Sequence, residues 1–103
     1  MDIFNERKSA TARENLLSAS KTEQVKRIVG ELYREGSRIG NGGTADAIRS
    51  EKRTGEKVGG KSHLQKGEER LRQIEKILKE FPDHPDRGIL EFLRKDLQDA
   101  LKG

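Results

Sequence analysis

Apolar side chains recur every three or four positions in three stretches of this 103-residue chain, which is the spacing of one face of an α-helix. The first stretch begins at about Thr22 and carries Val25, Ile28, Val29, Leu32 and Tyr33. We expect Ser20 or Thr22 to cap this helix, because a hydroxyl accepts a hydrogen bond from the first turn. Gly36 is expected to end it.

The second and third stretches flank a short segment that contains two prolines. A helix is expected over about 64–80, with an apolar face made of Leu71, Ile74, Ile77, Leu78 and Phe81. Pro82 and Pro85 break it, and another helix follows from about Asp86. Its apolar face consists of Ile89, Leu90, Leu93, Leu97 and Leu101. Phe81 and Phe92 are expected in the core.

A shorter helix is predicted over residues 44–54. Thr44 suits its N-cap, Asp46 lies in the first turn where the helix dipole favours an acid, and Gly55 ends it. Its apolar side chains are few, Ala45, Ala47 and Ile48, so we expect weak anchoring. The chain has no alternating strand pattern. These features predict an all-α fold, a small helical domain of four to five helices with a long basic glycine-rich central loop.

The expected organisation is one domain. Residues 1–20 read as a polar leader or a frayed helix, and residues 21–103 as a single helical domain whose site region is 36–67. Charged residues make up 39% of the chain, so the core is expected to be small. The chain has no cysteine, which excludes disulfides and thiolate metal sites. No apolar run reaches the length of a membrane span, and we expect no membrane segment.

The positive charge is concentrated in the middle of the chain. The net charge is +4, and residues 36–67 alone hold seven Lys or Arg against three Asp or Glu. Eight of the eleven glycines lie there as well. A basic, glycine-rich centre between balanced flanks favours a polyanion such as nucleic acid as the partner.

The densest part of this centre is "GEKVGGKSHLQKG", residues 55–67. Gly59 and Gly60, followed by Lys61, can form a nest of backbone N–H groups that binds an anion. The spacing is that of neither a P-loop nor a dinucleotide fingerprint. The alternative is a connection between helices whose lysines keep it soluble.

His63 is the candidate for proton transfer, because the unperturbed pKa of histidine, near 6.5, suits acid–base chemistry at neutral pH. Gln65 and Lys66 beside it can bind phosphate. The ordinary alternative is a surface histidine without a special role. His84 lies between two prolines, and we expect no catalytic role for it.

The charged side chains of the short helix allow two interpretations. Glu51 or Asp46 can orient His63, and Arg49 and Arg53 can contact phosphate; alternatively these residues form an ordinary solvated salt-bridge face. The two histidines have no paired spacing, so no metal site and no cofactor are expected. Tyr33 is the one candidate for stacking on a base.

Three blocks occur in order along the chain: "GNGGTADAIR" (40–49), "TGxxVGGKxHxQKG" (54–67) and "DLxxAL" (96–101). Together they resemble the C-terminal toxin module of bacterial polymorphic toxins, among them the contact-dependent growth-inhibition toxins. The similarity covers about two-thirds of the chain. Its matched candidates are Thr44, Asp46, Arg49, Glu51, Thr54, Gly59, Gly60, Lys61, His63, Gln65 and Lys66.

The resemblance implies a small antibacterial toxin domain, most often a ribonuclease, with a cognate immunity protein as its partner. It further implies delivery as part of a larger secreted effector and action on RNA in the cytoplasm of the target cell. Chemistry assigns the roles. His63, Lys61, Glu51 and Asp46 are the catalytic candidates for metal-independent RNA cleavage. The candidates for binding phosphate or RNA are Arg49, Arg53, Thr54, Gly59, Gly60, Gln65 and Lys66. The basic centre predicts an acidic face on the immunity protein.

Two other functions are compatible with the sequence. One is a non-enzymatic nucleic-acid-binding or phage assembly module, whose basic segment would only clamp a polyanion. The other, supported less well because the acids form no convincing ligand set, is a metal-dependent DNase.

Overall fold

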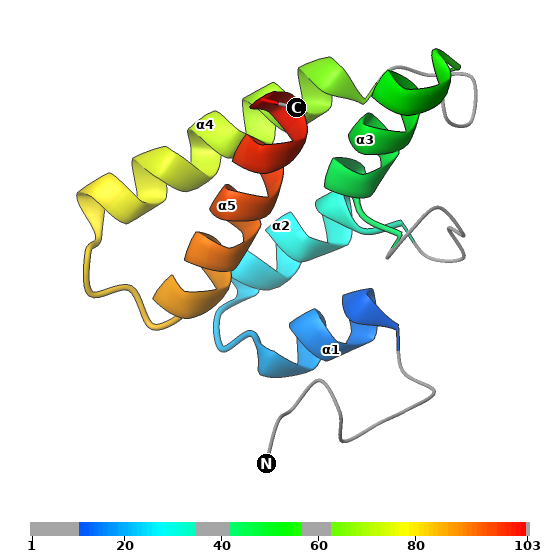
Figure 1. Ribbon diagram of the computed structural model, residues 1–103. Helices are drawn as coiled ribbons and strands as arrows, with labels where there is room; N and C mark the ends of the chain where they lie inside the picture. The colour runs from blue at the N-terminus through cyan, green and yellow to red at the C-terminus, as the bar shows by residue number, and fades with distance from the viewer. Residues whose placement is uncertain (1–10, 35–41, 57–62, 103) are drawn as a thin grey trace.

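In a computed structural model of the chain, the described residues are 11–34, 42–56 and 63–102, and they form five helices (Figure 1). The helices are α1 (Ala12–Ala19), α2 (Glu23–Leu32), α3 (Thr44–Thr54), α4 (Leu64–Glu80) and α5 (Arg87–Lys102). No strand occurs among the described residues, although Tyr33 and Gly43 form an isolated antiparallel bridge. The predicted all-α fold is confirmed.

Local signals set most of the helix boundaries. The Thr22 hydroxyl accepts a hydrogen bond from the Val25 N–H, so Thr22 caps α2 as expected. Gly55 ends α3 in the left-handed conformation, with φ of 76°. The prediction for Thr44 was wrong: Gly43 is the N-cap of α3, and the Thr44 hydroxyl donates to the Leu32 carbonyl. Helix α2 ends at Leu32, earlier than the expected end at residue 36, which lies outside the described residues.

The short helix α3 is packed more firmly than expected. Ala45, Ala47 and Ile48 are all buried, and α3 packs against both α4 and α5. Gly67, in the second turn of α4, is also buried, and a Cβ at this position would lie 2.5 Å from Ile48 Cδ1. The small residues therefore allow close packing of α3 and α4, which composition alone did not indicate.

Helices α4 and α5 form an antiparallel pair along one side of the molecule (Figure 1). Their apolar faces supply the buried residues Ile74, Ile77, Leu90, Leu93, Leu97 and Ala100. The prediction that Phe81 and Phe92 belong to the core was wrong, since 55% and 47% of their surface is exposed. Phe81 follows the last turn of α4, and Phe92 lies outside the row of buried leucines on α5.

The N-terminal helix shares this core. In α1 the Leu16 side chain is 1% exposed, and α1 packs against α2. Buried Asp86, just before α5, accepts hydrogen bonds from the backbone N–H groups of Lys21 and Thr22 and from the Thr22 hydroxyl. These contacts connect the segment between α1 and α2 to the start of α5.

The predicted long glycine-rich central loop is not confirmed. Residues 35–41 and 57–62 lie outside the described residues. Between them, α3 occupies eleven residues of the predicted site region, and α4 begins at Leu64 within it. The described part of the centre is therefore largely helical.

Candidate active site

His63 and Glu51 form a close pair where α3 and α4 meet. His63 immediately precedes α4, and Glu51 lies in the second half of α3. One carboxylate oxygen, Oε2, lies 2.7 Å from His63 Nδ1, and the other, Oε1, accepts the His63 backbone N–H at 3.1 Å. Two of the predicted catalytic candidates are thus in direct contact.

The contact fixes the orientation and tautomer of the imidazole. An ionised carboxylate can only accept, so Nδ1 carries the proton that is shared with Glu51. In the neutral ring Nε2 is then the acceptor, and no described residue forms a hydrogen bond with it. The side chains of His63 and Glu51 are only 21% and 13% exposed. The arrangement therefore presents Nε2 as a proton acceptor held by a largely buried partner.

The same contact has a structural role. The Glu51 carboxylate binds both a side-chain and a backbone group of His63, so it joins α3 to the N-terminal end of α4. The side chain of His63 is itself largely buried. Gly67, four residues further along, is buried against Ile48 of α3. A substitution of His63 must therefore be tested for stability as well as for activity.

Lys66 and Gln65 follow His63 in the first turn of α4. Lys66 is half-buried, and no described residue forms a hydrogen bond or ion pair with it. Burial and the nearby charge of Arg70 lower its pKa, although Glu31 partly offsets this. Exposed Gln65 donates to Glu69. Of the two, Lys66 is the one whose charge no described residue compensates by direct contact.

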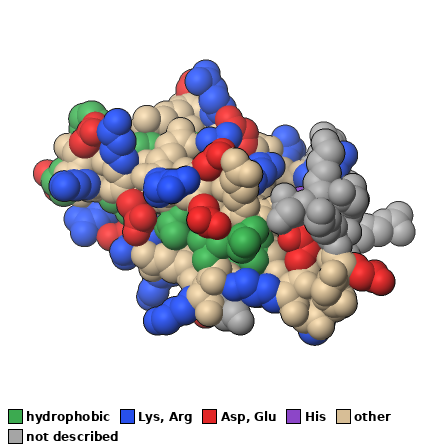
Figure 2. All heavy atoms as spheres, turned by 90° about the horizontal axis from the view of Figure 1, so that it is seen from above, with side chains coloured by type: hydrophobic (Ala, Val, Ile, Leu, Met, Phe, Trp, Pro, Cys, Tyr) green, Lys and Arg blue, Asp and Glu red, His purple; other side chains and the backbone are tan. Residues whose placement is uncertain are grey.

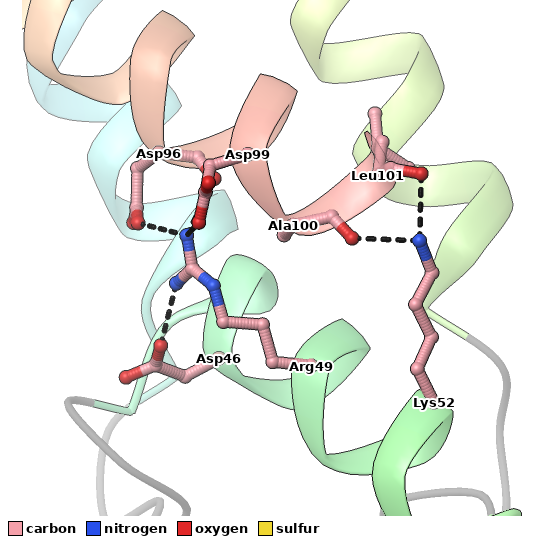
Figure 3. Close-up of polar contacts among 7 residues, drawn as sticks. All are labelled: Asp46, Arg49, Lys52, Asp96, Asp99, Ala100 and Leu101. Atoms are coloured by element: carbon pink, nitrogen blue, oxygen red, sulfur yellow. Dashed lines mark hydrogen bonds and ion pairs between the residues drawn. The ribbon is translucent and has the colours of Figure 1, made fainter. Parts of the chain in front are cut away.

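Arg49 has a structural role that differs from its predicted one. Its guanidinium lies 2.7 Å from Asp46, 2.8 Å from Asp96 and 3.0 Å from Asp99, and it also donates to the Asp96 carbonyl (Figure 3). Burial disfavours its charge, but the hydrogen bonds to Asp96 and Asp46 outweigh burial and raise the Arg49 pKa above its usual value. Three carboxylates surround one cation, so this group attracts no phosphate.

Asp46 belongs to the same cluster. Its carboxylate is ion-paired with Arg49 in the first turn of α3, whereas Glu51 is the acid that contacts His63. Of the two acids proposed to orient the histidine, the structure therefore favours Glu51.

The remaining predicted residues are Arg53 and Thr54 near the end of α3, Tyr33 after α2, and three residues before His63. Arg53 is exposed near the end of α3, and the Thr54 hydroxyl donates to the Ser50 carbonyl and accepts the Glu56 N–H. Gly59, Gly60 and Lys61 lie outside the described residues. Tyr33 is 2% exposed, so the prediction that it stacks on a base was wrong.

His84 is part of the turn before α5, as its sequence position indicated. Its Nδ1 accepts the Asp86 N–H at 2.9 Å, and Nε2 lies 3.1 Å from Gln24 Oε1. Both ring nitrogens therefore have partners within the fold.

Sequence reasoning missed a group of charges beside Lys66. Arg70, one turn further along α4, is ion-paired with Glu31 of α2 at 2.8 Å, and Arg34 lies three residues after Glu31. The spacing of Lys66 and Arg70 was visible in the sequence. The approach of α2 to α4 was not.

The surface charge is mixed. On the face shown in Figure 2, Lys and Arg side chains are interspersed with Asp and Glu side chains. Over the described residues, no three His, Asp or Glu side chains are grouped to hold a metal ion. None of the described helices is both long and apolar enough to span a membrane.

Comparisons with known proteins add no assignment, since no family model, curated protein or solved structure matches the chain.

Proposed function

We propose that the chain is a toxin domain that cleaves RNA without a metal ion, with His63 as the catalytic base and Glu51 as its positioning residue. The observation that carries the proposal is the Glu51–His63 contact, at 2.7 Å from Nδ1, in which Nε2 has no partner among the described residues. This is the arrangement in which a carboxylate holds a histidine for proton transfer.

In this reaction Nε2 takes the proton of a ribose 2′-OH. The 2′-oxygen then attacks the adjacent phosphorus, the bond to the 5′-oxygen breaks as that oxygen takes a proton from water, and a 2′,3′-cyclic phosphate and a free 5′-hydroxyl form. Glu51 stabilises the resulting imidazolium through Nδ1. Lys66, three residues after His63, supplies positive charge that attracts the RNA strand to the site. Lys61 remains a proposed member of the site on sequence grounds.

The resemblance to polymorphic toxin modules supports the biological part of the proposal. We propose that the domain is delivered within a larger effector to the cytoplasm of a target cell. There it acts on RNA, and an immunity protein with an acidic face neutralises it. Expression of the chain alone in bacteria should then arrest growth, and His63→Ala should relieve the arrest.

A second candidate function is a nucleic-acid-binding module without catalytic activity. The observation that favours it is the double contact of Glu51 with His63, because it joins two helices and would be useful in a protein that only binds. The two candidates differ in a single property, the cleavage of RNA.

The test is cleavage of labelled RNA by wild type, His63→Ala, Glu51→Gln and His84→Ala, each well below its melting temperature. His63→Ala should lower the rate by about 10²- to 10⁴-fold, and Glu51→Gln by a smaller factor. His84→Ala should leave it near the wild-type rate. Added imidazole should restore part of the activity of His63→Ala, which a purely structural role would not allow.

A chelator separates the alternatives further. Wild-type cleavage of RNA should persist in EDTA, and plasmid DNA should stay intact. RNA cleavage that EDTA abolishes and magnesium restores would contradict the metal-independent mechanism. Binding of RNA without any cleavage by the folded wild-type protein would favour the second candidate.

A further inference from the structure

Four charged side chains meet where the end of α2 faces the first half of α4. Arg70 Nη2 lies 2.8 Å from Glu31 Oε2, and Arg70 Nη1 donates to Gln73. Lys66 precedes Arg70 by one helical turn, and Arg34 follows Glu31 by three residues. Glu31, Arg70 and Arg34 all lie close enough to Lys66 for their charges to act on it, so three cations share this place with one carboxylate.

This group of four side chains carries more positive than negative charge. Lys66 has no hydrogen-bond or ion-pair partner among the described residues. Burial, Arg70 and Arg34 all lower its pKa, while Glu31 alone raises it. Glu31 neutralises only part of the charge of the three cations. A second anion bound here would therefore interact favourably with the remaining positive charge. Glu31 is 38% exposed, so it can yield its place to a ligand from solvent.

We propose that Arg34, Lys66 and Arg70 form a phosphate-binding subsite for a neighbouring phosphodiester of an RNA strand, and that Glu31 occupies it in the free protein. The binding of a phosphodiester at this subsite does not depend on the proposed function. Only the further statement, that the same RNA strand reaches His63 with its scissile phosphate, rests on it. Lys66 and Arg70 follow His63 by three and seven residues on nearly the same face of α4. Their rise along the helix axis is roughly 4.5 and 10 Å. The subsite therefore lies beside the catalytic base rather than on it.

The first experiment measures binding of a short 2′-O-methyl RNA, which lacks the attacking hydroxyl, by fluorescence anisotropy at several salt concentrations. Lys66→Gln should weaken binding about tenfold. It should also lower the slope of log affinity against log salt by about 0.7, the value for one lost contact to a single strand. Lys79→Gln is the matched control, because Lys79 is an exposed lysine in the last turn of the same helix. It should change neither quantity.

The second experiment tests the role of Glu31. Glu31→Gln removes the competing carboxylate and should tighten binding about two- to fivefold. Glu23→Gln makes the same change of charge in the first turn of α2, where Glu23 is 88% exposed and pairs with Lys26. It should leave the affinity unchanged. Melting curves check that every variant is folded.

Equal effects of the two lysine variants, or of the two glutamate variants, would overturn the subsite, since net charge alone would then explain binding. The outcome is separable from that of the ribonuclease proposal. The expected binding pattern without RNA cleavage by wild type would keep the subsite and remove the ribonuclease. Cleavage with equal effects of the paired variants would do the reverse.

Discussion

At the scale of single residues, Gly67 allows α4 to pack closely against α3 because glycine has no side chain. A Cβ at this position would lie 2.5 Å from Ile48 Cδ1, with Leu97 and Leu101 methyl groups at 3.7 and 3.8 Å. Ile48 is 1% exposed and has little room to move. Glycine is therefore required by the neighbouring helices, although it weakens α4 itself.

Gly67→Ala should destabilise the protein by about 1 kcal/mol, because overpacking outweighs the gain in helix propensity. Gly30→Ala is the matched control: Gly30 lies in α2, and a Cβ there meets nothing within 4 Å. It should stabilise by about 0.5–1 kcal/mol. Urea unfolding measures both. Ile48→Val should recover part of the loss in Gly67→Ala, and a stabilising Gly67→Ala would contradict the packing argument.

Asp86 is a buried acid that connects the start of α5 to the segment between α1 and α2. Burial raises its pKa, but hydrogen bonds from Thr22 and from the Lys21 and Thr22 backbone outweigh burial, so the pKa is lowered below its ordinary value of 3.8. A group with a lowered pKa in the folded state stabilises the protein in full above its unfolded pKa. That contribution is lost as the pH falls through the folded pKa.

Asp86→Asn should therefore cost about 2 kcal/mol at pH 7, because it weakens three hydrogen bonds to a charged acceptor. The difference from wild type should shrink as the pH falls below about 4. Asp83→Asn changes an exposed aspartate three residues earlier and should have little effect at either pH. Urea unfolding at pH 7 and near pH 3 provides the comparison; a difference that does not depend on pH would refute the assignment.

At the scale of helices, two side chains of α3 hold the last turns of α5 (Figure 3). Arg49 binds Asp96 and Asp99, and Lys52 Nζ donates to the carbonyls of Ala100 and Leu101 at 2.8 and 2.6 Å. Those carbonyls belong to the helix end, where they have no partner within the helix. A lysine there also complements the negative end of the helix dipole.

Arg49→Lys keeps the charge but loses the planar group that reaches three carboxylates, so it should destabilise by about 1–2 kcal/mol. Arg49→Ala should cost more, because the mutual repulsion of the aspartates is no longer compensated, and high salt should reduce this extra cost. Thermal melting at two salt concentrations measures these effects. RNA binding by Arg49→Lys should match wild type below its melting temperature. If Arg49→Lys bound RNA more weakly but were as stable as wild type, the prediction that Arg49 contacts phosphate would be supported instead.

At the scale of the whole molecule, the five helices share one core. Leu16 of α1 is buried together with residues of α2, α4 and α5 in a single cluster. Small domains with one core usually unfold in one cooperative step. The segment predicted as a polar leader or frayed helix thus contributes to the stability of the whole through α1.

Leu16→Ala should lower the free energy of unfolding by about 2–4 kcal/mol. It should lower the midpoint temperature of the single unfolding transition without adding a second transition. Leu17→Ala, next to it and only half-buried, should cost clearly less. Circular dichroism and intrinsic tyrosine fluorescence of Tyr33 should melt together in both variants. An early, separate transition of α1 in wild type would show that the helix is not part of the cooperative unit.

The helices could be predicted because their signals are local. The apolar spacing of α2, α4 and α5, the Thr22 cap and the Gly55 end all act within one or two turns. Arg49 could not be placed, because Asp96 and Asp99 lie about fifty residues further along the chain. Its partners depend on how α3 crosses α5.

In the candidate site, too, local signals could be predicted and contacts between distant segments could not. The sequence identified His63 and offered two acids as its partner, Glu51 and Asp46. Only the packing of α3 against α4 selects Glu51. Likewise, Arg34 and Glu31 join Lys66 because α2 approaches α4, a contact that no spacing along one helix encodes.

The position of α5 has a consequence for synthesis on the ribosome. Helix α5 contributes the buried residues Leu90, Leu93, Leu97 and Ala100, and it is translated after helices α1 to α4. Until α5 has left the exit tunnel, the apolar faces of α3 and α4 have no partner on that side, and Arg49 lacks Asp96 and Asp99. Earlier helices can form in the nascent chain, but they have little to hold them together. The domain should therefore acquire its folded state only after α5 has left the tunnel.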